Sequence, residues 1–181
     1  MKLLLHICCG PCALYPIKEL LCKKFEKITG FFYNPNIHPP SEYKKRRDAL
    51  SEASAKIGFK VIIPEYKMEE YFAKIFGRGT ACRAPTERCP LCWELRLSET
   101  AKFAKDNGFD AFTTTLLISP YQDHKKIRKI GEAIAKEKAI GFYYEDFRPG
   151  FKDGQEEAKK ENLYRQKYCG CVFSELERVD L

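Results

Sequence analysis

The chain has 181 residues, of which 44% are hydrophobic and 31% charged, and its formal net charge is +7. This length is typical of one domain with its own core, spanning 1–181, and no apolar run is long enough for a transmembrane helix. The basic excess fits a polyanionic partner such as RNA. The apolar run near the N-terminus is too short for a signal peptide, so we expect a cytoplasmic protein with no membrane partner.

The pattern of apolar residues predicts strands that alternate with helices. In chain order we expect a strand over 3–7, a helix over 13–27, a strand over 28–33, a helix over 42–57 capped by Ser41, a strand over 60–64, helices over 68–76 and 93–107, a strand over 110–118, a helix over 123–138, a strand over 140–144, and helices over 155–168 and 174–178. This alternation is typical of an α/β domain with a mostly parallel sheet of about five strands flanked by helices.

The nine cysteines are the most informative residues of the chain. Because their number is odd and cytosolic thiols are kept reduced, metal binding or redox chemistry is favoured over a disulfide framework. Cys8, Cys9 and Cys12 lie in the turn after the first predicted strand. Ligands bind at the carboxyl ends of strands in open α/β sheets, so this turn is a candidate site. Cys22 falls within a helical pattern and is expected as a small buried side chain.

A second pair, Cys89 and Cys92, lies at the start of a predicted helix. Residues three apart share one helical face, and the helix N-terminus stabilises thiolates. The pair alone also fits a thioredoxin-like dithiol or half of a zinc site. Together with Cys8 and Cys9 it supplies four thiolates, which suit a [4Fe–4S] cluster as well as zinc. We favour the cluster because further cysteines remain, among which Cys12 is a stronger candidate than Cys82 for a neighbouring thiol or a ligand of another metal.

Cys169 and Cys171 form a third group, separated only by Gly170. A disulfide across so small a ring departs from preferred geometry, and strained disulfides are easily reduced. This pattern favours a switchable dithiol. The alternatives are that both residues are metal ligands or that one is simply buried.

Five segments of the chain, in this order, resemble the epoxyqueuosine reductases of the QueH family. They are residues 6–12, 33–39, 89–97, 113–121 and 164–171. The resemblance implies a cobalamin-independent oxidoreductase that reduces the epoxide of epoxyqueuosine at the tRNA wobble position to the alkene of queuosine, the last step of queuosine biosynthesis.

The resemblance also implies a set of cofactors and site residues. It places a [4Fe–4S] cluster on Cys8, Cys9, Cys89 and Cys92, leaves open a second, mononuclear iron near Cys12, and assigns a redox-active disulfide to Cys169 and Cys171. Its electron donor would be a cytosolic protein such as a ferredoxin or a flavodoxin. The implied fold is similar to the PP-loop or HUP-like nucleotide-binding folds. ATP is not expected, because the loop after the first strand lacks a Ser-Gly-Gly phosphate signature.

Basic residues near the cysteines are the candidate contacts to tRNA. RNA loops are held by aromatic stacking and by phosphate contacts from Lys and Arg. The residues we expect in this role are Arg78, Arg83, Arg88, Lys45 and Arg46. The basic run at 125–129 fits a solvated helix face better.

Proton delivery and two competing functions remain open at this point. His6, His38, Asp146, Tyr121 and Tyr164 are candidate proton donors, although His6 in an apolar strand also fits a hydrogen-bonded core residue and tyrosines often serve packing. The competing functions are a zinc-stabilised tRNA-binding module without catalysis and a PP-loop-like tRNA sulfur-transfer enzyme.

Overall fold

The first strand lies at the centre of a parallel sheet in the computed structural model, which describes residues 1–77 and 84–179. β1 (Lys2–His6) pairs with β2 (Lys27–Phe31) on one side and with β4 (Ala111–Thr114) on the other. β3 (Val61–Ile62) and β5 (Gly141–Phe142) form the two edges, so the strand order is β3-β2-β1-β4-β5. All four pairings are parallel, which confirms the predicted fold class.

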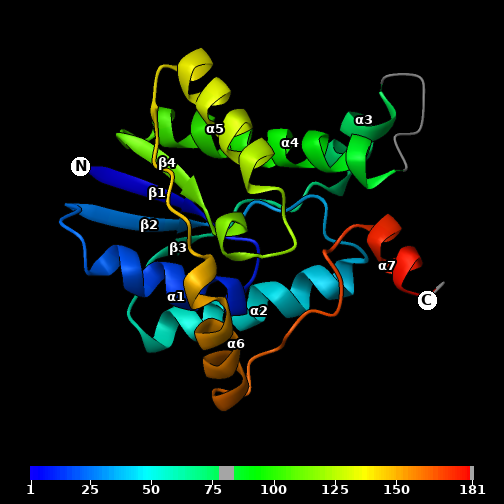
Figure 1. The fold of residues 1–181 in the computed structure, drawn as a ribbon, viewed down its shortest axis with the longest axis horizontal. Coiled ribbons are helices and arrows are strands. Elements are labelled where there is room, and N and C mark those ends of the chain that lie inside the picture. The colour runs from blue at the N-terminus through cyan, green and yellow to red at the C-terminus, as the bar shows by residue number, and fades with distance from the viewer. Residues whose placement is uncertain (78–83, 180–181) are drawn as a thin grey trace.

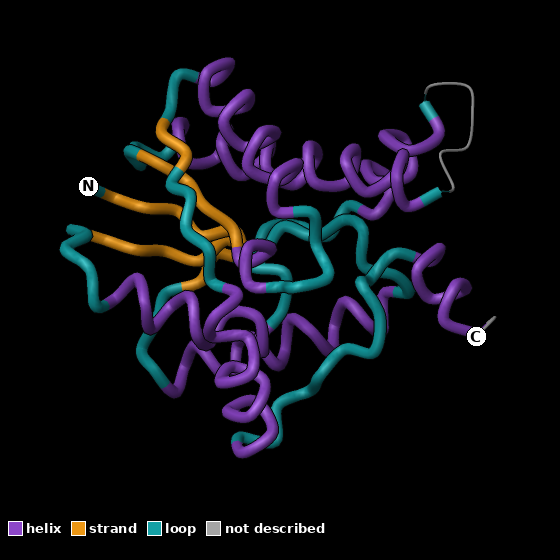
Figure 2. Tube along the Cα trace, viewed as in Figure 1, coloured by secondary structure: helices purple, strands orange, loops and turns teal. Residues whose placement is uncertain are grey.

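Helices cover both faces of the sheet (Figure 1). The layer on one face contains α1 (Gly10–Leu21), α2 (Pro40–Lys56) and α6 (Phe151–Lys160). The layer on the other face contains α3 (Met68–Phe76), α4 (Pro85–Asp106) and α5 (His124–Lys138). A loop runs from α6 past α2 to α7 (Val172–Val179), which lies beyond the carboxyl ends of the strands (Figure 2).

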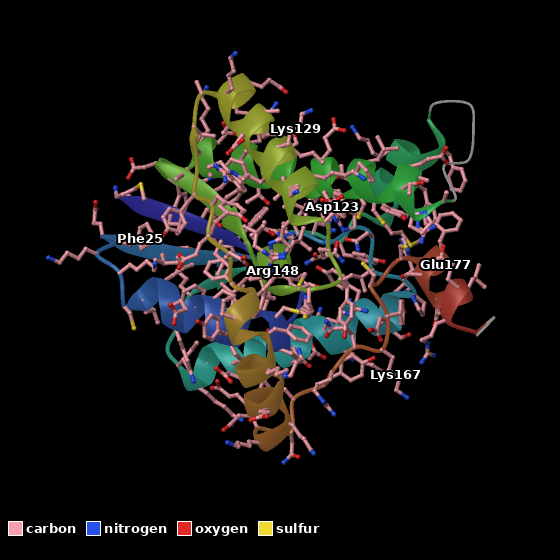
Figure 3. All side chains as sticks on the ribbon, in the orientation of Figure 1. Phe25, Asp123, Lys129, Arg148, Lys167 and Glu177 are labelled. Carbon is pink, nitrogen blue, oxygen red and sulfur yellow. The ribbon has the colours of Figure 1, made fainter. Side chains whose placement is uncertain are left out.

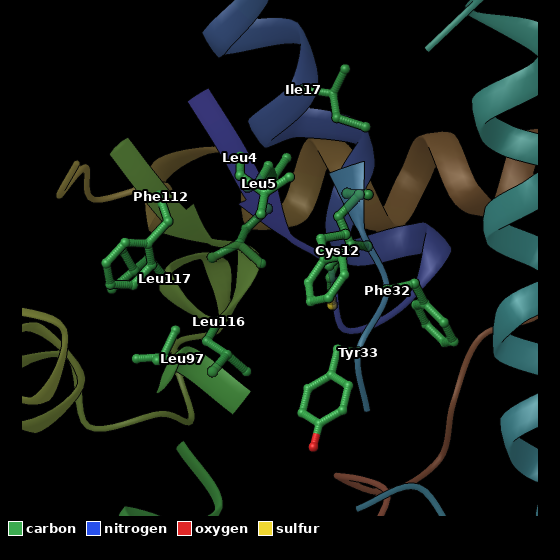
Figure 4. Close-up of a cluster of buried hydrophobic side chains, with 14 of the residues drawn as sticks. Leu4, Leu5, Cys12, Ile17, Phe32, Tyr33, Leu97, Phe112, Leu116 and Leu117 are labelled. Carbon is green, nitrogen blue, oxygen red and sulfur yellow. The ribbon is translucent and has the colours of Figure 1, made fainter. Parts of the chain in front are cut away.

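The core is built around β1 because both faces of the sheet are covered. Leu3, Leu4 and Leu5 are completely buried, so consecutive side chains are apolar instead of alternating with polar ones. Leu97 packs into this core from α4 and Ile17 from α1, as Figure 4 shows. The continuous apolar run of the sequence is therefore explained by a central parallel strand.

The strand order reverses between β1 and β4, and their carboxyl ends are joined by polar contacts. The Nδ1 atom of His6 lies 2.9 Å from the hydroxyl of Thr114. The backbone N–H of Cys8 donates to the hydroxyl of Thr115 over 3.1 Å. Such reversal points form the ligand crevices of open α/β sheets. The first cysteine turn therefore lies at the expected site position.

Several predicted boundaries are wrong for local reasons. The strand predicted over 110–118 ends at Thr114, whose hydroxyl accepts from the N–H of Leu116 and starts a short 3-10 helix, Thr115–Ile118. α2 begins at Pro40 and its N-cap residue is Pro39, so Ser41 lies inside the helix instead of capping it. The helix predicted to begin at 93 begins eight residues earlier, at Pro85.

The two ends of α1 also differ from the prediction. α1 begins at Gly10 instead of residue 13, with Pro11 in its first turn, where proline is favoured. A Cβ atom on Gly10 would lie 3.0 Å from the backbone of Ala49, so glycine permits the close approach of α1 and α2. Cys22 follows the end of α1 and is exposed, which corrects the expected burial. None of the described helices is long and apolar enough to cross a membrane.

Candidate active site

The first group of thiols comes from the turn between β1 and α1. The sulfur atoms of Cys8, Cys9 and Cys12 lie within 4.8 Å of one another, and this is the only group of three potential metal-binding side chains that close together in the described part of the chain. Cys9 and Cys12 are buried and Cys8 is half-buried. Three soft sulfur ligands converging on one point suit zinc or an iron–sulfur centre.

Contacts within the turn make the three thiols unequal. Hydrogen bonds with Cys12 and Cys9, with a further contribution from Thr115, lower the pKa of Cys8 well below its usual value. The same contact with Cys8 raises the pKa of Cys12, and burial raises that of Cys9. The hydroxyl of Thr115 lies 3.4 Å from the Cys8 sulfur. Cys8 is therefore the most easily ionised thiol of the group.

A cavity of about 350 Å³ opens beside this turn. Three cysteines line it: Cys8, Cys12 and Cys169. Its other lining residues are mainly polar or aromatic and include Arg46, Arg96, Thr115, Tyr121, Gln122, Phe151, Gln155, Gln166, Lys167 and Tyr168. The cavity therefore combines thiols with amide groups and aromatic rings, the groups that can recognise a nucleobase.

A second, smaller cavity is lined by the cysteines of α4 and of the C-terminal turn, whereas Cys9 lines neither cavity. Cys89, Cys92 and Cys171 line it together with Cys169. Arg96 and Cys169 belong to the walls of both cavities. Thiols from the beginning, middle and end of the chain thus surround two adjoining cavities.

Cys89 and Cys92 lie on α4, but not at its N-terminus. Because α4 begins at Pro85, Cys89 is the fifth residue of the helix and Pro90 lies inside it. The helix dipole acts within the first turn, so it does not stabilise these thiolates as we expected. Instead, burial raises the pKa of Cys89 to about 11 and that of Cys92 to about 12. A metal would have to displace their protons.

The turn that carries Cys169 and Cys171 is held against α2 by buried groups. Arg46 donates to the carbonyl oxygens of Cys169 and Tyr168, each over 3.0 Å. Its Nε atom donates to Glu42 over 2.8 Å, so the charge is paired. The carbonyl oxygen of Gly170 accepts from the backbone N–H of His38 over 2.7 Å.

Cys169 and Cys171 have different surroundings. Cys169 is exposed at the cavities, and its sulfur lies 3.9 Å from the amide nitrogen of Gln122. Cys171 is buried and packs with Cys92 and Tyr71. Burial raises the pKa of Cys171, but hydrogen bonds with Ser174 and Tyr71 and the charge of Arg88 together outweigh it, and the net direction is downward. One thiol is therefore accessible and the other is the more easily ionised.

The predicted tRNA contacts differ in their accessibility. Lys45 is exposed and its amine lies 5.6 Å from the centre of the Tyr164 ring. Arg46 and Arg88 are each only 2% exposed, and Arg88 pairs with Glu177 over 2.6 Å. Neither arginine is therefore an exposed cation: Arg46 is held by the buried Glu42 and Arg88 by the exposed Glu177. The candidates Arg78 and Arg83, and the thiol of Cys82, lie outside the described residues.

The two candidate histidines are buried and uncharged at neutral pH. His6 is completely buried, and burial is the main cause that lowers its pKa to about 4. Its ring nitrogens lie near the Thr114 hydroxyl and the carbonyl oxygen of Tyr33, so it is a hydrogen-bonded core residue. Burial likewise lowers the pKa of His38 to about 4, and its ring stacks on Phe72. Neither ring lines either cavity.

The remaining proton-donor candidates differ in their pairing and in their access to the larger cavity. Asp146 pairs with Arg148, whose hydrogen bond lowers the aspartate pKa to about 2. Tyr164 donates to Glu42 over 2.5 Å. Tyr121, by contrast, is 84% exposed and lines the larger cavity. Only Tyr121 of these three is therefore placed where a bound molecule can reach it.

Sequence reasoning missed Arg96, which lines both cavities together with Cys169. It lies on α4 four residues after Cys92 and is 2% exposed. A charged residue on the same helical face as two cysteines was the signal in the sequence, because residues four apart lie one above the other.

The chain is similar to known proteins over nearly its whole length. The family model described as "Epoxyqueuosine reductase QueH" matches residues 3–177. Curated proteins named epoxyqueuosine reductase QueH are similar over nearly the whole chain. The one from Dehalococcoides mccartyi is 40% identical over 98% of this chain and 94% of its own length. The one from Thermotoga maritima is 38% identical over 97% of this chain and 91% of its own length.

The fold also resembles that of a solved structure with low sequence identity to this chain. It is described as a predicted subunit of a tRNA methyltransferase from Methanocaldococcus jannaschii, and the two structures superpose with a TM-score of 0.52. The match covers 88% of this chain and 76% of the other, at 12% identity. At this identity the likeness supports the α/β fold alone.

Proposed function

Since the chain belongs to the QueH family of epoxyqueuosine reductases, we propose that it reduces the epoxide of epoxyqueuosine in tRNA to the alkene of queuosine. It is thus an oxidoreductase of tRNA modification. The observation that carries the proposal is the gathering of Cys8, Cys89 and Cys169 around two cavities that share Arg96. A reductase of a small strained ring needs redox groups beside a cavity large enough for a modified base.

A [4Fe–4S] cluster on Cys8, Cys9, Cys89 and Cys92 fits the chemistry of these residues. Sulfur ligands are the donor set of such clusters, and a buried guanidinium beside them favours an anionic group. When bound, the cluster supplies one-electron transfer. Cys12 lies within 4.8 Å of Cys8 and Cys9, so a second iron near it belongs to the same proposal. Zinc on these thiols is the competing outcome.

The reaction balances with the dithiol of Cys169 and Cys171 as the reductant. Both C–O bonds of the epoxide break, and the oxygen leaves as water after taking up two electrons and two protons. Oxidation of the two thiols to a disulfide supplies the two electrons and the two protons. A one-electron donor protein, such as a ferredoxin or a flavodoxin, then reduces the disulfide in two steps. The reaction needs no ATP.

The tRNA is proposed to approach the rim of the larger cavity. Tyr121 is exposed there and its ring packs edge-on against Phe151, which leaves a face for stacking. Lys167 lies on the loop before α7, is exposed, and lines the same cavity (Figure 3). Lys45 adds a second exposed cation, near Tyr164. An unpaired wobble base can thus leave its stack and enter the cavity.

The tRNA substrate and the free thiols fit the reducing cytoplasm.

The proposal is tested by anaerobic incubation with epoxyqueuosine-containing tRNA and a chemical reductant, followed by nucleoside analysis. The wild-type protein should contain iron and sulfide and form queuosine over many turnovers. Cys169→Ser and Cys171→Ser should each lose multiple turnover. Cys22→Ser is the matched control, because that thiol is exposed beyond the end of α1.

The outcomes separate the competing functions. A colourless, zinc-loaded protein that binds the tRNA without forming queuosine would support the binding module. Consumption of ATP with sulfur transfer would support the sulfur-transfer enzyme. Full turnover by both serine variants would remove the dithiol from the reaction while leaving the reductase assignment intact.

A further inference from the structure

We propose that Arg96 is the buried counter-charge of the redox site and that it raises the site's reduction potential. Arg96 acts through the thiols around it and is therefore a positioning residue. The inference rests on the proposed function, because it requires a redox centre on those thiols.

The guanidinium of Arg96 is enclosed by the protein yet incompletely bonded. The side chain is 2% exposed, and its Nε atom donates to the carbonyl oxygen of Cys92 over 3.2 Å. The Nη2 atom is buried and has no hydrogen-bond partner in the structure. An unused donor on a buried cation is costly unless another group accepts from it.

The other two buried arginines of the site are paired with carboxylates, and Arg96 is not. Arg46 pairs with Glu42 and Arg88 with Glu177. Within residues 1–77 and 84–179, Arg96 forms no ion pair with an aspartate or a glutamate. The nearby ionisable groups that interact with it are the thiols of Cys92, Cys169, Cys8 and Cys89 and the uncharged ring of His6. Its positive charge therefore faces sulfur.

The position of Arg96 between the two cavities explains why a cation belongs there. It lines the cavity of Cys8, Cys12 and Cys169 and also that of Cys89, Cys92 and Cys171. A centre ligated by four thiolates carries net negative charge, and each added electron increases that charge. A buried cation stabilises the reduced form more than the oxidised form, and it acts strongly because little water screens it.

The test compares Arg96→Met, which removes the charge at similar volume, with Arg96→Lys, which keeps it. Lys102→Gln is the matched control, because Lys102 is an exposed residue of the same helix and its loss changes the net charge equally. The iron-loaded proteins are titrated anaerobically with dithionite, and the midpoint potential is read from the visible and paramagnetic resonance spectra. The metal-free proteins are compared by thermal unfolding.

Arg96→Met should lower the equilibrium constant of reduction at least tenfold. For one electron, a tenfold change makes the midpoint potential about 59 mV more negative. Arg96→Lys should recover most of this shift, and Lys102→Gln should stay at the wild-type potential. In the metal-free protein, Arg96→Met should raise the unfolding temperature, because it removes a buried charge that lacks a carboxylate partner. If Arg96→Met fails to retain iron while Arg96→Lys retains it, the counter-charge is again supported.

Two results would overturn the inference. One is an equilibrium constant of reduction for Arg96→Met that lies within a factor of two of the wild-type value. The other is a lower unfolding temperature of metal-free Arg96→Met, which would mean that the guanidinium is already compensated by the protein. A wild-type protein without any redox-active iron would instead contradict the proposed function, and the thermal comparison would still decide the role of Arg96.

Discussion

The guanidinium of Arg46 donates a hydrogen bond to the carbonyl oxygen of Cys169 over 3.0 Å, across 123 positions of sequence. The same side chain binds the carbonyl oxygen of Tyr168 and is held by Glu42. Arg46 lies on α2, whereas Cys169 lies on the loop between α6 and α7 (Figure 1). This contact fixes the position of the C-terminal thiols beside the strand ends.

Removing the Arg46 side chain should release this turn. In the metal-free, reduced protein we expect Arg46→Met to increase the rate of Cys169 alkylation severalfold, measured by mass spectrometry of the peptide. Arg46→Lys should give a smaller increase, because one ammonium cannot reproduce the two parallel bonds of the guanidinium. Arg47→Met, on a half-buried neighbour paired with Asp48, is the control. Equal rates in all four proteins would show that the turn is held by other contacts.

Gly170 should tolerate no side chain. Its φ angle is +132°, and an added Cβ would lie 3.1 Å from Arg46 and 3.2 Å from Ile37. Gly170→Ala should therefore lower the free energy of unfolding by roughly 1–3 kcal/mol, measured with urea. Gly108→Ala is the comparison, because Gly108 also has a positive φ but open space around it. A smaller loss for Gly170→Ala than for Gly108→Ala would contradict the packing described here.

Acid should destabilise the protein through His38. Burial lowers the folded-state pKa of His38 to about 4, below the unfolded value of 6.5. The unfolded chain thus binds more protons, and the stability present above pH 6.5 is lost as the pH falls toward 4. The loss attributable to His38 should reach on the order of 2–3 kcal/mol. Urea unfolding at pH 7 and pH 4.5 should show a smaller acid loss for His38→Phe; equal losses in both proteins would exclude His38 as the cause.

Binding of tRNA should depend on Lys45 and Lys167. Each exposed lysine that neutralises a phosphate adds roughly 0.7–0.9 to the slope of log affinity against log salt concentration. Lys45→Gln and Lys167→Gln should each lower the affinity and reduce the slope by about that amount. Lys24 is exposed and lies beyond the end of α1 that is far from the cysteine turn. Lys24→Gln should therefore leave the affinity and the slope unchanged. Wild-type slopes for the two site variants would place the tRNA on another surface.

The sequence was sufficient for the sheet because the apolar pattern of β1 reflects its burial on both faces. It was insufficient where one residue could serve two roles. Thr114 has strong strand propensity, yet its hydroxyl accepts from Leu116 and ends the strand. Pro90 looked like the start of a helix, but α4 already begins at Pro85. Local composition therefore indicated the elements, whereas tertiary contacts set their ends.

The site was predictable to a similar degree. The cysteine groups could be found because their spacing is unusual, but only the first group follows a strand; α4 and the loop before α7 bring the others to the carboxyl end of β1. Lys45 and Arg46 could not be told apart, since adjacent basic residues on a helix face different directions. Only the fold shows that Lys45 is exposed while Arg46 binds Glu42 and Cys169. The role of Arg96 likewise depends on segments far apart in the chain.

We propose that the dithiol of Cys169 and Cys171 supplies the electrons for epoxide reduction. The most direct measurement is a stoichiometry: reduced protein, freed of external reductant, is mixed anaerobically with excess epoxyqueuosine-containing tRNA. Queuosine is counted by nucleoside analysis and the disulfide by mass spectrometry of differentially alkylated peptides. We predict one queuosine formed for each Cys169–Cys171 disulfide. Queuosine formed while both thiols stay reduced would contradict the account.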